Sequence, residues 1–243
     1  MIPGEQTGRT DLKTLLRQWV TEPSLILLIT PILTMVWVYF GKQAVFEQLW
    51  LRGDPHQDLY SALYEFLTAF LLMGVVPLLI VKLVFKGRLR DFGVQLGDAK
   101  FGFIATAIAA PLLVLALAIG TADPTMQAEY PLARSAVQNP LFYLAVETAY
   151  IALYYTSWEF FYRGFMLFGL EKHYGALAAI LIQTIPSTIV HIGKPPSETF
   201  AALVAGLAFG YLAVRTRSVV YPLILHAIVG VSTNLFALMW AGR

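Results

Sequence analysis

The chain of 243 residues contains no cysteine, and only 13% of its residues are charged, against about a quarter in an average soluble domain. The absence of cysteine excludes disulfides, thiolate metal sites and a cysteine nucleophile. Hydrophobic residues make up 58% of the chain and its mean hydropathy is +0.66, which argues against a soluble protein. A formal net charge of +2 gives no indication of a nucleic-acid partner.

The apolar residues form long blocks and do not show the alternation that is typical of outer-membrane β-strands. A membrane-spanning helix needs about 20 mostly apolar residues. Blocks that meet or approach this length occupy residues 24–40, 59–85, 101–120, 140 to about 172, 175–192, 197–214 and 219–240. The sequence therefore predicts an all-α protein, a polytopic transmembrane helical bundle of about seven spans that is embedded in a lipid bilayer.

The polar residues 1–23 predict a cytoplasmic N-terminal segment, followed by a single membrane-embedded domain over residues 24–243. No small-x-small cleavage site follows the first apolar block, which ends at Phe40-Gly41-Lys42-Gln43, so this block predicts an uncleaved span rather than a signal peptide. Lysine and arginine concentrate in the segments that lie inside if the N-terminus is cytoplasmic. The charge pattern therefore predicts a cytoplasmic N-terminus.

Ionisable side chains are few within the predicted spans, where a charge is costly and usually marks function or a specific pairing. Six are candidates for a position at membrane depth: Glu65, Glu147, Glu159, Arg163, His191 and His226. No aspartate falls within a span, which removes the chemistry of a two-aspartate intramembrane protease. Neither an HExxH zinc motif nor a Gly-x-Ser-Gly nucleophile motif occurs.

Glu159 and Arg163 are four residues apart, which places both side chains on one helix face, as either a structural ion pair or part of a site. At a rise of about 1.5 Å per residue, His191 returns to the level of Glu159 after a helical hairpin, and His226 reaches a similar level on the last span. Pro186 removes a backbone hydrogen bond before His191 and predicts a broken helix beside a cavity. We therefore expect one carboxylate and two imidazoles to meet inside the bundle.

These residues resemble the CPBP family of CAAX-protease and bacteriocin-processing membrane proteins, also called the Abi family. Its pattern is EExxxR on one helix, FxxxH on the next, and HxxxN, or a small residue in place of the asparagine, on a later one. Glu159-x-x-x-Arg163 matches the second half of the first motif, and His191 and His226 match the histidines of the other two. The resemblance covers a motif-bearing core of about residues 140–235, and with the compact size of the chain it indicates a prokaryotic inner (plasma) membrane.

Three positions depart from the family pattern. Trp158 stands where the first glutamate is usual, Ser187 where phenylalanine is usual, and Gly230 where asparagine is usual. In the family, that glutamate is held to activate water and that asparagine to help hold the oxyanion. Thr233 and Asn234, further along the last span, are the candidates for a replacement polar group.

The resemblance implies an intramembrane endopeptidase that acts on a membrane-associated peptide or protein, with no nucleic acid and no cofactor involved. Glu159 would act as general base on a water, His191 would share or orient that water, and His226 would stabilise the oxyanion. Arg163 would orient Glu159. An alternative employs zinc held by Glu159, His191 and His226, which make a known catalytic ligand set.

Two other functions stay open at this point, as does the oligomeric state. Without the first glutamate and the asparagine, the chain could be a proteolytically inactive CPBP-like membrane scaffold that binds a partner through the same cavity. A transporter would also use buried glutamate and histidine. Inverted repeats are typical of transporters, and the sequence shows none.

Overall fold

The computed structural model describes residues 20–50 and 52–242. Within these residues the secondary structure is helical, apart from one isolated bridge between Ile192 and Lys194. The predicted all-α class is therefore confirmed. Most of the predicted N-terminal segment, residues 1–19, lies outside the described residues.

The α-helices are α2 (Glu22–Phe40), α3 (Gln43–Leu49), α4 (Gln57–Ala69), α5 (Val76–Leu79), α6 (Ala99–Gly120), α7 (Pro124–Glu129), α8 (Pro140–Ala149), α9 (Thr156–Glu159), α10 (Gly169–Tyr174), α11 (Ala176–Ile189), α12 (Pro196–Thr216) and α13 (Val220–Ala241). The π-helical segments are η1 (Phe70–Val75), η2 (Ile80–Val84), η5 (Tyr150–Tyr155) and η6 (Phe160–Phe168). Two 3-10 turns, η3 (Leu89–Phe92) and η4 (Arg134–Gln138), lie in the connections. Helical structure runs without a break from α4 to η2 and from α8 to α10.

All seven predicted blocks are helical, and five of the helices among the described residues are long and apolar enough to cross a membrane. These five are Glu22–Leu49, Gln57–Val84, Ala99–Gly120, Pro196–Thr216 and Val220–Ala241. Helix α11 is apolar but shorter. The helix over residues 140–174 is not among the five, because its tyrosines and its charged residues Glu147, Glu159 and Arg163 lower its hydropathy.

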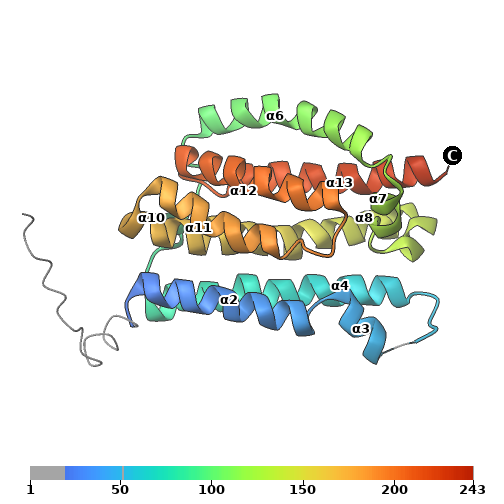
Figure 1. The fold of residues 1–243 in the computed structure, drawn as a ribbon, viewed down its shortest axis with the longest axis horizontal. Coiled ribbons are helices and arrows are strands. Elements are labelled where there is room, and N and C mark those ends of the chain that lie inside the picture. The colour runs from blue at the N-terminus through green and yellow to red at the C-terminus, as the bar shows by residue number, and fades with distance from the viewer. Residues whose placement is uncertain (1–19, 51, 243) are drawn as a thin grey trace, which may run out of the picture.

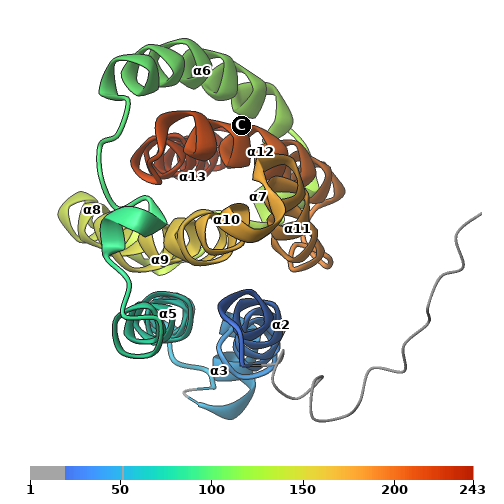
Figure 2. The same ribbon diagram turned by 90° about the vertical axis from the view of Figure 1, so that its left-hand side faces the viewer.

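This polar helix occupies the middle of the bundle. Figures 1 and 2 show α6 as the outermost layer on one side, then α12 and α13, then α8 to α10 together with α11, and finally α2 with α4 and α5. Every residue of η6, including Arg163, is buried. Because a charged side chain in lipid is costly, the packing of apolar helices on both sides is what allows this helix to carry charges.

Ion pairs between loops and helix ends fasten one end of the bundle, the end at which α10 and the starts of α2 and α6 lie (Figure 1). Arg215 lies 2.8 Å from Asp98, and Lys172 lies 2.6 Å from Glu22. Asp98 also accepts a hydrogen bond from Phe101 N at the start of α6, and this bond and Arg215 hold the pKa of Asp98 below its usual value. These basic residues belong to the segments predicted to face the cytoplasm, an orientation that stays a prediction.

Candidate active site

The carboxylate of Glu159 contacts one cation and one imidazole. Its Oε1 atom lies 3.3 Å from Arg163 Nη1 and 2.6 Å from His226 Nδ1. Arg163 stands one turn further along the same helix, and His226 comes from α13. The side chains of Glu159 and Arg163 are 0% and 3% exposed, whereas that of His226 is 20% exposed. The imidazole is therefore the member of this group that a reactant can reach.

The helix geometry around Glu159 is unusual. Glu159 ends α9, a four-residue α-helical segment that lies between the π-helical segments η5 and η6. Segments of π-helix are rare in proteins, and those that occur are often found at functional sites. Phe209 of α12 covers the group from another side, because its ring lies 5.7 Å from the Arg163 guanidinium and 6.1 Å from the His226 ring.

His191 lies just beyond the end of α11 and does not reach Glu159 through any hydrogen bond recorded among the described residues. Its Nδ1 lies 2.7 Å from the carbonyl oxygen of Ser187. A carbonyl can only accept, so Nδ1 carries the proton and Nε2 keeps its lone pair. The sequence predicted that Pro186 breaks this helix. That prediction is wrong, because α11 continues through Pro186 and ends at Ile189.

The indole of Trp158 fills the space beside both histidines. Its ring centroid lies 5.5 Å from that of His191 and 6.5 Å from that of His226, and both contacts are edge-on. Trp158 is 4% exposed. Trp158 stands where the CPBP pattern has a carboxylate. At this position both imidazoles therefore contact an apolar ring and no acidic group.

The zinc alternative requires Glu159, His191 and His226 to share one ion. Across residues 20–50 and 52–242, no three His, Cys, Asp or Glu side chains are grouped closely enough to hold a metal ion. His191 packs on Trp158 and bonds the backbone at Ser187, and only His226 contacts the carboxylate. These residues do not fit the zinc ligand set.

Neither candidate for a replacement polar group has a recorded contact with His226. Thr233 Oγ1 donates to the carbonyl oxygen of Val229, and Asn234 Nδ2 donates to Glu147 Oε1 at 2.6 Å. Tyr155 packs more closely on the His226 ring than Phe209 or Trp158 does, with ring centroids 4.4 Å apart. The sequence analysis did not single out Tyr155. The signal that could have found it is its position four residues before Glu159, which places the two side chains on the same helix face.

A second polar cluster is centred on Lys194, in the loop between α11 and α12. Lys194 pairs with Glu129 of α7, and its Nζ lies 3.5 Å from the hydroxyl of Tyr130, which in turn donates to Glu198 Oε1 at 2.8 Å. Burial lowers the pKa of Lys194, but the carboxylates of Glu198, Glu129 and Glu65 raise it, and the net shift is upward. Lys194 N also donates to the carbonyl oxygen of His191 at 3.0 Å, so the cluster and that histidine share one loop.

Replacing Lys194 by methionine is expected to lower the free energy of unfolding by about 1–3 kcal/mol, since it leaves neighbouring carboxylates facing one another without their cation. Thermal unfolding in detergent, followed by tryptophan fluorescence, measures the effect. Lys172→Met is the matched control, because it removes a half-exposed pair with Glu22 that is worth little. Equal melting temperatures for the two variants would contradict a structural role of the Lys194 cluster.

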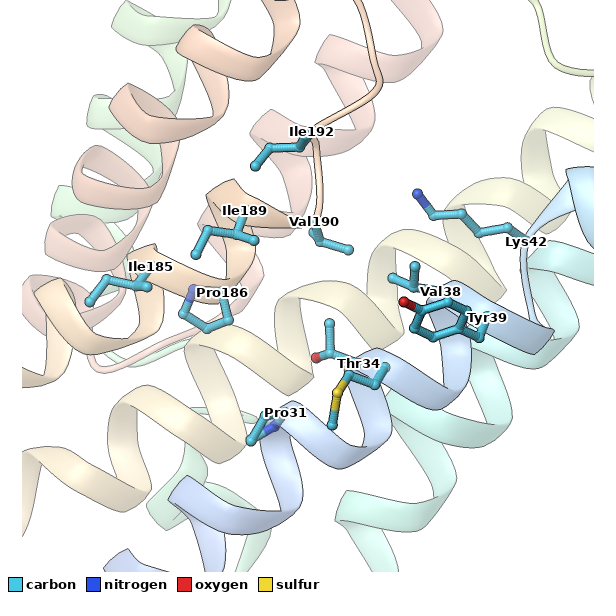
Figure 3. A pocket seen from close by; sticks show the side chains of 11 residues that line it. Pro31, Thr34, Val38, Tyr39, Lys42, Ile185, Pro186, Ile189, Val190 and Ile192 are labelled. Carbon is cyan, nitrogen blue, oxygen red and sulfur yellow. The ribbon is translucent and has the colours of Figure 1, made fainter.

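An apolar groove of about 350 Å³ lies between α2 and α11 and extends to the neighbours of His191. Figure 3 shows Pro31, Thr34 and Val38 of α2 on one side and Ile185, Pro186 and Ile189 of α11 on the other. Val190 and Ile192, which flank His191 in the sequence, also line it. An apolar segment can thus lie along the bundle next to the histidine loop.

Residues 148–232 match a family model described as Type II CAAX prenyl endopeptidase Rce1-like. The matched segment contains Glu159, Arg163, His191 and His226. Comparison with curated proteins and with solved structures gave no match.

Proposed function

Through residues 148–232 the chain belongs to the Rce1-like family, and on this premise we propose that it is an intramembrane endopeptidase. Its substrate is a membrane-associated peptide or protein, and the family description suggests prenylated tails as the first class to try. The observation that carries the proposal is the 2.6 Å contact between the Glu159 carboxylate and the His226 imidazole inside the bundle.

The contact supports a specific division of work. When Nδ1 of His226 donates to Glu159, Nε2 keeps its lone pair and can take a proton from water. The hydroxide forms a bond to the scissile carbonyl carbon, and the imidazolium returns the proton to the leaving amine as the peptide bond breaks. The Glu159 charge holds the tautomer and stabilises the imidazolium, as a buried carboxylate does for other catalytic imidazoles.

This assignment differs from the one that the sequence suggested, in which Glu159 itself takes the proton. The complete burial of the Glu159 side chain and the partial exposure of His226 favour the indirect role. Arg163 donates to Glu159 Oε1 and orients the carboxylate. His191, with Nε2 free to accept, is suited to hold the second hydrogen of the water.

The test is hydrolysis by purified protein in liposomes, with a pool of farnesylated peptides that end in a CAAX box and of unmodified single-span tails. We expect new peptide termini, identified by mass spectrometry, that form with the wild-type protein and not with Glu159→Gln. If a folded wild-type protein produces none from the whole pool, the protease assignment is wrong.

One observation favours a second function. Trp158 fills the space beside both histidines at the position of a usual catalytic carboxylate, as it would in an inactive scaffold that binds a partner through this site. A scaffold is expected to retain a captured membrane partner after Glu159→Gln. Loss of cleavage in that variant, with the wild type active, decides for the protease.

A further inference from the structure

We infer that Tyr155 is a positioning residue for His226, and that Gly230 exists at its position to admit the Tyr155 ring. The inference rests on the proposed function, because it assigns a residue that acts on the imidazole of the same site. It concerns a contact between η5 and α13, at the position where the family pattern has asparagine and this chain has glycine.

The Tyr155 ring packs closely against two other rings. The Tyr155 ring lies 4.4 Å from the His226 ring, with an interplanar angle of 38°. On another side it meets the ring of Tyr150, at 4.3 Å and 33°. Tyr155 is 4% exposed and Tyr150 is 7% exposed, so neither ring has room to move aside. The tyrosine thus braces the imidazole from the helix that also carries Glu159.

Gly230 supplies the space that this arrangement needs. It stands one turn beyond His226 on α13, and a Cβ atom at this position would lie 1.9 Å from the Tyr155 hydroxyl and 2.5 Å from Cζ of its ring. Contacts under 3 Å cannot be accommodated without movement, and both atoms belong to a buried, rigid ring. A side chain at position 230 and the observed position of Tyr155 are therefore mutually exclusive.

The chemical consequence is a fixed geometry for the hydrogen bond between His226 and Glu159. An imidazole can rotate about two side-chain bonds, and a displacement of about 1 Å at a catalytic group can cost about 100-fold in rate. Glu159 restrains the ring at Nδ1, and Tyr155 restrains its face. The two contacts together leave Nε2 pointing in one direction.

Four variants test this role: Tyr155→Phe, Tyr155→Ala, Gly230→Ala and the double variant Tyr155→Ala/Gly230→Ala. Because phenylalanine keeps the ring, it should retain kcat within about threefold, whereas Tyr155→Ala should lower kcat by about 10- to 100-fold with KM within about twofold. Gly230→Ala should lower kcat to a similar extent by displacing the ring. The kcat of the double variant should be no lower than that of Tyr155→Ala, since both substitutions remove the same contact between Tyr155 and His226.

A second readout does not depend on activity. The chain has four histidines, so NMR of the imidazole NH groups can be assigned with a His226→Gln variant. A downfield Nδ1 proton from the bond to Glu159 is expected in the wild type and in Tyr155→Phe, and it should be lost or shifted in Tyr155→Ala and Gly230→Ala. If this signal is unchanged in Tyr155→Ala, or if phenylalanine behaves like alanine, the positioning role is wrong. If the signal follows the pattern but no variant cleaves any substrate, the proposed function alone fails.

Discussion

Replacing Glu159 by glutamine is expected to lower kcat/KM by about 10²- to 10⁴-fold. Glutamine keeps the size of the side chain and can still accept from Arg163, but it offers no negative charge to an imidazolium at His226. Removal of the carboxylate behind a catalytic imidazole has an effect of this order in other hydrolases. The measurement is the rate of product formation in liposomes, normalised to folded protein.

Glu147→Gln is the matched control for this experiment. Glu147 is also a buried carboxylate on the polar central helix, but it accepts a hydrogen bond from Asn234 Nδ2, and a glutamine oxygen can accept that bond. We expect activity within about threefold of the wild type and a melting temperature close to that of Glu159→Gln. Cleavage by Glu159→Gln at a rate close to that of Glu147→Gln would refute a role of this carboxylate in the reaction.

Replacing His226 by alanine is expected to lower kcat/KM by about 10²- to 10⁴-fold, since it removes the group that exchanges the proton with water and with the leaving amine. His173→Ala is the control, because His173 is exposed at the tip of α10. Both variants are compared on the same substrate in the same liposomes. An active His226→Ala enzyme would rule out the imidazole as the base.

The double variant Glu159→Gln/His226→Ala separates the two assignments of the base. If Glu159 works through His226, the double variant should be no slower than His226→Ala alone, because residues that act as a unit are strongly non-additive. If Glu159 takes the proton directly and His226 stabilises the oxyanion, the two losses should multiply. Comparison of the rates of the two single variants and the double variant therefore tests which residue acts as the base, and not only whether both residues are needed.

Local spacing predicted the part of the site that depends on one helix. Arg163 lies four positions after Glu159, and helix geometry alone requires the two side chains to be neighbours. The contact of Glu159 with His226 depended on the relative depth of two spans, which the lengths of the apolar blocks and the charged loops constrain. The all-α class followed from the same blocks, since backbone groups in lipid must be satisfied within each segment.

The positions of His191, Trp158 and Tyr155 could not be predicted in the same way. Depth arithmetic placed His191 at the level of Glu159, but it carries no information about the volume of the indole that takes up the space beside both histidines. The fit of Tyr155 against Gly230 joins two helices through the shape of a ring and an absent side chain. Such complementarity has no periodicity, so one sequence does not reveal it.

The central place of the polar helix over residues 140–174 has a consequence for how the protein is made. That segment leaves the ribosome before α12 and α13 exist, so the partner that His226 provides for Glu159 arrives only with α13. Until then Arg163 is the one recorded counter-charge of this carboxylate in the described chain. The polar segment therefore gains its full set of contacts only once α13 has been made and packed against it.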